Sequence, residues 1–120
     1  MKALVFAIVT ALTVMALVGA NSLILRTSLT ALVEECESIP DSTSNKINYE
    51  QLYESFMKKQ KFISLTVSHD DLTEIENDLA EIIGACEAND EDTLIIAKSR
   101  LIMTLTHLRR LSGVNLDSIL

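Results

Sequence analysis

The sequence has few of the residues that break or bend a helix: three glycines and one proline among 120 residues. Tryptophan is absent, and aromatic residues make up only 4% of the chain. Because phosphate-cradling loops and nucleophile elbows need glycines in a fixed pattern, these motifs are excluded. Leucine, alanine and glutamate are plentiful, and they lose little side-chain freedom in a helix. We therefore predict an all-α protein that is not an enzyme and needs no cofactor.

Basic side chains are also scarce, with 10 Lys and Arg against 17 Asp and Glu. Two of the basic residues, Lys2 and Arg26, flank the hydrophobic N-terminal segment. The rest of the chain then has eight basic side chains against all 17 acidic ones, a formal net charge of −9. This balance disfavours nucleic acid and anionic lipid as partners.

The N-terminal segment has no charged residue from Ala3 to Leu25. At about 1.5 Å per residue it reaches about 34 Å as a helix, close to the roughly 30 Å of a bilayer's hydrocarbon core. Lys2 before it and an acidic region after it favour a cytoplasmic N-terminus. We predict a single-pass cell-membrane anchor over residues 1–25 and an extracytoplasmic acidic helical domain over residues 26–120.

A cleaved secretory signal is the alternative to a permanent anchor. The small residues Val18-Gly19-Ala20 are typical of a site cut before Asn21, which would release the domain as a secreted protein. Leu23, Ile24 and Leu25 extend the apolar run beyond that site, which favours retention. Both interpretations place the domain outside the cytoplasm.

Apolar residues at spacings of three and four predict that the anchor helix continues into the domain to about Ser38. A loop containing Pro40 follows over residues 39–45, and a second helix is expected from about Asn48 to Thr66. Ser68 and Asp71 form a capping pair at the start of a third helix. The third stripe comprises Leu72, Ile75, Leu79, Ile82, Ile83 and Cys86.

A polar turn over residues 89–92 separates the third helix from a fourth, whose stripe comprises Leu94, Leu101, Ile102, Leu105, Leu108 and Leu111. Gly113 is expected to end this helix in a left-handed cap. The apolar tail of residues 114–120 should then fold back on the bundle. The predicted architecture is an N-terminal transmembrane helix that continues into an up-and-down bundle of about four helices.

Three stretches carry a family resemblance: Ser68-His69-Asp70-Asp71-Leu72 with Ile75, then Thr106-His107-Leu108-Arg109, and the apolar end Leu116-Asp117-Ser118-Ile119-Leu120. Together they resemble an uncharacterised bacterial family of short single-span membrane proteins, domain of unknown function 4363. The resemblance covers nearly the whole chain. It implies a membrane-spanning start and a helical remainder, and it implies no activity.

His69 and His107 are the only histidines, and an antiparallel helix pair could bring them near each other. With Asp70 or Asp71 they are the candidate ligands of a metal such as zinc, or a proton-sensing pair. No helical His pair or Cys pair supports a closed metal site. We favour structural roles for both histidines, one beside a helix cap and one near a helix C-terminus.

Cys36 and Cys86 both fall near the distal end of the predicted bundle. A disulfide between them is possible in an oxidising compartment, and two small apolar core residues are the alternative. The paired carboxylates, such as Asp70-Asp71, are interpreted as solvated surface. The cluster of Lys58, Lys59 and Lys61 is interpreted as a solvated helix face rather than a contact with lipid headgroups.

These features favour a membrane-tethered, non-catalytic interaction or scaffold module of the cell envelope. Its expected partner is an envelope or membrane protein. The alternative is an extracytoplasmic sensor domain that binds a proton, a metal or a small ligand. The sequence leaves the oligomeric state open.

Overall fold

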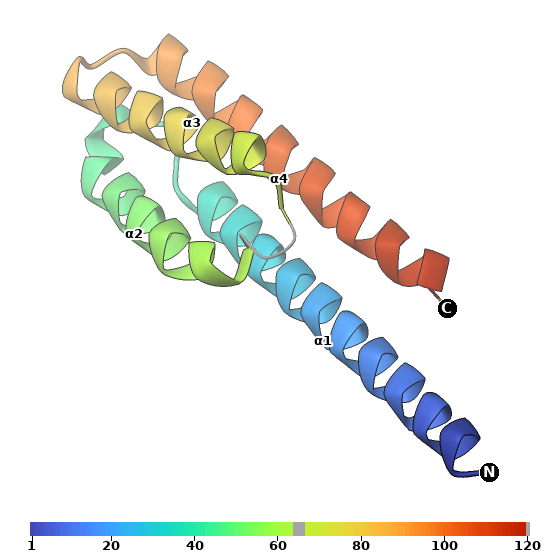
Figure 1. Cartoon of the computed structure of the whole chain (residues 1–120). Coiled ribbons are helices and arrows are strands. Elements are labelled where there is room, and N and C mark those ends of the chain that lie inside the picture. Colours follow the sequence, from blue (N-terminus) through green and yellow to red (C-terminus); the bar gives the residue numbers. More distant parts are fainter. Residues whose placement is uncertain (64–66, 120) are drawn as a thin grey trace.

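The computed structural model describes residues 1–63 and 67–119, and within these ranges it is helical without strands. Four α-helices follow one another up and down: α1 (Lys2–Ser38), α2 (Lys46–Ile63), α3 (His69–Glu87) and α4 (Glu91–Ile119). A short 3-10 helix, η1 (Thr43–Asn45), precedes α2. α1 lies beside α2 and α4, and α3 lies beside the same two helices (Figure 1). The predicted all-α, up-and-down bundle is confirmed.

α1 is one uninterrupted helix that serves two regions of the molecule. Its 37 residues extend about 55 Å at 1.5 Å per residue, and its N-terminal part projects well beyond the bundle (Figure 1). From Leu25 onward, every third or fourth residue is buried against the other helices: Leu25, Leu29, Leu32, Val33 and Cys36. The predicted continuation of the hydrophobic segment to Ser38 is confirmed.

The loop after α1 is organised by its proline. Ile39 adopts an extended conformation (φ −84°, ψ 124°), as expected for a residue that precedes proline. Ser42 caps η1 by accepting a hydrogen bond from the Ser44 amide. The second helix was predicted from about Asn48 to Thr66, but α2 begins two residues earlier, because η1 leads directly into it, and ends at Ile63. Residues 64–66 lie outside the described residues.

The start of α3 confirms the predicted cap. The Ser68 hydroxyl accepts a hydrogen bond from the Asp71 amide at 3.3 Å and donates one to the Asp71 carboxylate at 2.9 Å. Asp90 plays the same role for α4, since its carboxylate accepts from the Thr93 amide (3.2 Å) and hydroxyl (2.6 Å). Asn89 takes a left-handed conformation (φ 52°), which asparagine tolerates better than most residues. The turn predicted between α3 and α4 is therefore confirmed.

The predicted end of the last helix is wrong. α4 continues through Gly113 to Ile119, so Gly113 does not form a left-handed cap and residues 114–119 do not fold back as a separate tail. A glycine inside a helix costs only about 1 kcal/mol relative to alanine. No proline follows it in this chain, so nothing forces the helix to stop. Leu120 lies outside the described residues.

The core is apolar and draws on all four helices. Its largest fully buried side chains are those of Tyr49, Phe56, Leu29, Leu32, Leu52, Ile63, Ile75, Leu79, Ile82, Leu94, Leu101 and Leu105. Every apolar stripe predicted from the sequence contributes to this list. The core ends near Leu25 on α1 and Leu108 on α4, each 5% exposed, so the N-terminal part of α1 lies outside it.

Candidate functional site

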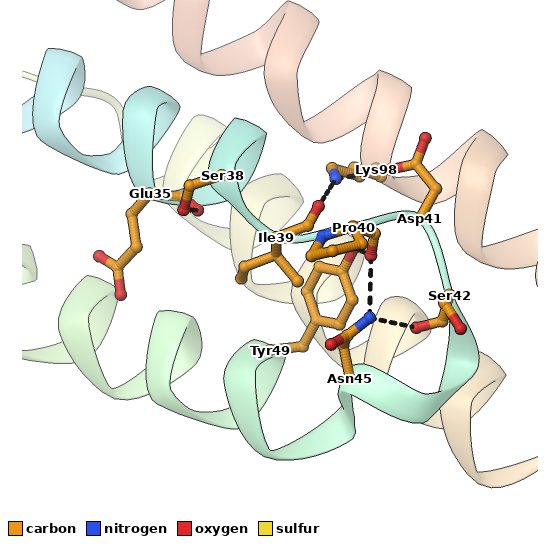
Figure 2. Close-up of polar contacts among 9 residues, drawn as sticks. All are labelled: Glu35, Ser38, Ile39, Pro40, Asp41, Ser42, Asn45, Tyr49 and Lys98. Carbon is orange, nitrogen blue, oxygen red and sulfur yellow. Dashed lines mark hydrogen bonds and ion pairs between the residues drawn. The ribbon is translucent and has the colours of Figure 1, made fainter.

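The most elaborate polar cluster lies at the end of the bundle far from the N-terminus, which we call the distal end. Lys98 of α4 is 6% exposed, and its ammonium reaches the loop between α1 and α2 (Figure 2). It donates hydrogen bonds to the carbonyl of Ile39 and, at 2.6 Å, to the carboxylate of Asp41. The Lys98 nitrogen also lies 5.7 Å from the centre of the Tyr49 ring. One buried lysine thus ties α4 to the end of α1.

Two further side chains fasten the same loop. The Tyr49 hydroxyl donates to the Pro40 carbonyl at 3.1 Å, and the Asn45 amide donates to the Pro40 and Ser42 carbonyls, each at 3.3 Å (Figure 2). These bonds satisfy carbonyls of the loop that follows α1. The cluster is therefore a clamp on the loop.

The lysine of the clamp and the thiol beside it are held in their protonated forms. Burial lowers the pKa of Lys98, but Asp41 and Tyr49 outweigh this effect and leave that pKa raised. Burial also raises the pKa of the neighbouring Cys36 thiol to about 11. A protonated amine has no free lone pair, and a protonated thiol is a poor nucleophile. Neither group has the state that covalent catalysis requires at neutral pH.

A second buried charge lies between α3 and α4. Asp78 is 4% exposed, and one of its carboxylate oxygens, Oδ2, is buried without a hydrogen-bond partner. Its other oxygen lies 3.8 Å from the Arg100 guanidinium, which also forms an ion pair with Glu81 at 2.5 Å. Burial raises the pKa of Asp78, and the charge of Arg100 only partly offsets this rise.

The two candidate histidines do not face each other. Both are exposed. His69 lies nine residues before Asp78, two and a half helical turns, and so on the opposite side of α3 from the side that contacts Arg100 of α4. His107 lies on α4, beside Met103, Thr106 and Arg110. Asp70 and Asp71 are in the first turn of α3, where Asp71 takes part in the Ser68 cap.

No group of three or more His, Cys, Asp or Glu side chains that could hold a metal ion occurs among residues 1–63 and 67–119. Cys36 and Cys86 lie in the last turns of α1 and α3, the predicted distal position, and both are buried free thiols in the structure. Burial raises the pKa of Cys86 as well. Both thiols therefore occupy the core in their protonated form.

Exposed apolar side chains also lie along the outer face of α4. Ile95, Ile96 and Met103 are 44%, 59% and 71% exposed. Shallow depressions of about 230 and about 330 Å³ lie at its two ends, the first beside Glu37 and Lys98 and the second beside His107. Exposure of isoleucine and methionine side chains to water costs free energy, so this face is suited to contact with another apolar surface.

Lys98 and Asp78 were not among the predicted functional residues, although the sequence pattern contains a signal for both. Lys98 follows Leu94 by four residues and precedes Leu101 by three, and Asp78 follows Ile75 by three residues and precedes Ile82 by four. A charged residue at a stripe position is expected to be buried and paired.

No protein-family model, curated protein or solved structure matches the chain. The resemblance to the single-span family stays a prediction.

Proposed function

We propose that this protein is a membrane-tethered, non-catalytic interaction module of the cell envelope. The observation that carries the proposal is the N-terminal part of α1. Before Leu25, most of its large apolar side chains are exposed, among them Phe6 at 74% and Leu17 at 65%. An apolar helix of this length is stable in a bilayer, where its backbone is satisfied internally.

By length and composition, α1 is apolar enough to cross a membrane. A signal sequence near an N-terminus meets the same criterion. The continuity of α1 favours the anchor, because the same helix supplies core residues from Leu25 to Cys36. Cleavage before Asn21 would leave the exposed residues Leu23 and Ile24 at a new, fraying helix end. We therefore infer a cell-membrane anchor with a cytoplasmic N-terminus, and an extracytoplasmic domain.

The partner we propose is an envelope or membrane protein that contacts the outer face of α4. α4 runs along the bundle toward the anchor (Figure 1), so a membrane-embedded partner would lie beside this helix. Lys98 is held by Asp41 and the Ile39 carbonyl, and both thiols are buried in the core. These contacts support a binding role over an enzymatic one.

Photocrosslinking in intact cells tests this proposal. A photoreactive amino acid at Met103, on the outer face of α4, is expected to form an adduct with a membrane or envelope protein. The same amino acid at Gln51, an exposed position on α2, is the matched control and should give no such adduct. An equal yield at both positions, or no protein adduct at Met103, would contradict the proposed interaction.

Proton sensing is a second candidate function, and Asp78 is the observation that favours it. Its buried, unpartnered oxygen and raised pKa make the neutral acid easier to form than in an exposed aspartate. Arg100, Glu74 and Glu81 are the charged groups around it. Protonation would weaken its attraction to Arg100 and loosen the contact between α3 and α4.

A further inference from the structure

The basic side chains are not spread evenly over the bundle. α2 and α4 both run back toward the N-terminal half of α1 (Figure 1), and each has a basic cluster on that part of its length. The last turns of α2 contain Lys58, Lys59 and Lys61, and α4 contains Arg109 and Arg110. Arg26 is the first charged residue after the apolar part of α1. Six of the ten basic residues are therefore near the end of the bundle from which the apolar helix projects.

Contacts between the helices fix the level of these residues along the bundle axis. Lys98 of α4 donates to the carbonyl of Ile39, the residue that follows α1. Arg110, twelve residues further along α4, therefore lies level with about residue 27 of α1, because antiparallel helices advance equally. Ser55 of α2 donates to Glu35 of α1 at 3.2 Å, which places Lys61 level with about residue 29 of α1. Along the bundle axis, Lys61 and Arg110 are therefore within about one helical turn of the level of Arg26. We call Arg26, Lys58, Lys59, Lys61, Arg109 and Arg110 the basic belt.

Acidic side chains are concentrated at the opposite end. The distal loops and adjoining helix ends contain Glu37, Asp41, Glu87, Asp90, Glu91 and Asp92. At the belt, Asp70 and Asp71 lie in the first turn of α3, where they suit the positive end of that helix. Glu54 lies one helical turn before Lys58 on α2, and Glu34 lines the same depression as Arg26. The six basic residues of the belt outnumber these four acids. The negative net charge of the whole chain averages two ends of opposite sign.

We propose that the basic belt binds the anionic phospholipid headgroups of the bilayer that holds α1. This inference rests on the proposed anchor, because Arg26 reaches the headgroup region only if the apolar helix before it spans the membrane. Arginine presents paired donors to phosphate, and long lysine stems can lie along apolar surface while the ammonium stays in the polar region. The net charge argued against anionic lipid as a partner, but a bilayer surface meets only the end of the domain that faces it.

The same arrangement orients the domain. An anionic surface repels the distal end and attracts the belt. The bundle is therefore expected to stand upright on the membrane, with the distal end farthest from the lipid. Each lysine or arginine near such a surface strengthens binding by roughly fivefold. A tilted bundle would bring the distal acids toward the surface and lose this gain.

The test uses the full chain with phosphatidylglycerol and phosphatidylcholine in equal amounts, and native mass spectrometry counts the lipids retained. The expected result is enrichment in phosphatidylglycerol. The double variant Lys58→Glu, Lys59→Glu should lower this enrichment at least about fivefold. Lys46→Glu is the matched control, because Lys46 begins the same helix at its distal end and its ion pairs with Glu50 and Glu87 are largely exposed. It should leave the enrichment unchanged.

Equal retention of both lipids by the unaltered chain, or an equal loss in Lys46→Glu, would overturn the proposal. Raising the salt concentration to about 1 M should abolish the enrichment without any substitution, since the screening length falls to about 3 Å. Flotation with phosphatidylcholine vesicles separates the two inferences. A chain that does not float refutes the anchor and the belt together, whereas a chain that floats without lipid preference refutes the belt alone.

Discussion

Replacing Lys98 with methionine should destabilise the domain by about 2 kcal/mol. Methionine keeps most of the apolar volume of the lysine stem, so the change chiefly removes the ammonium and its hydrogen bonds to Ile39 and Asp41. Ile39 is 6% exposed, and a buried carbonyl left without a partner costs roughly 1–3 kcal/mol. The Asp41 side chain is 54% exposed, so its ion pair adds little because water screens it. The carbonyl therefore accounts for most of the loss.

Urea unfolding of the full chain in mild detergent, followed by circular dichroism, measures this free energy. Asp41→Asn should cost within about 0.5 kcal/mol, and Lys58→Met, at an exposed position on α2, should be equally mild. The pKa of Lys98 is raised on folding, so its contribution is fully present below the ordinary lysine value of 10.5 and is lost as the pH rises through the raised pKa. A Lys98→Met chain as stable as the unaltered one would refute the clamp.

Two further predictions concern the other buried ionisable groups. Asp78→Asn should be at least as stable as the unaltered chain at pH 7, because it removes a buried charge whose Oδ2 has no partner. The pKa of Asp78 is raised above 3.8. The free energy of unfolding of the unaltered chain should therefore increase relative to that of the variant as the pH falls through this raised pKa toward 3.8. A difference in unfolding free energy that does not change with pH would contradict this. Cys36, with a pKa of about 11 against an ordinary 9.0, should react with iodoacetamide at pH 8 about a hundredfold more slowly in the folded chain than in urea. Equal rates would show that the thiol is not buried.

The helices were predictable because their signals are local. The four helices were recognised from their apolar stripes at helical spacing, from the single proline and from the Ser68 cap. The short connections between them indicated an up-and-down order. Gly113 was misread because a glycine is only a weak stop signal without a following breaker. The fold class therefore followed from periodicity, whereas one helix end depended on a balance of about 1 kcal/mol.

The functional features were harder to predict because they depend on contacts between distant residues. Lys98 and Asp41 are 57 residues apart, and Asp78 meets Arg100 across two helices. The sequence alone predicted that Lys58, Lys59 and Lys61 form a solvated face. Only the fold places them level with Arg110 and close to Arg26. Composition gives the total charge, and the topology decides which end of the bundle holds it.

The central claim is that α1 is at once a membrane anchor and a strut of the bundle. Alkaline carbonate extraction of membranes, followed by intact mass measurement of the extracted chain, tests it most directly. The account predicts that the protein stays in the membrane pellet and that its mass still includes residues 1–20. A protein released into the supernatant, with a mass that begins at Asn21, would contradict it.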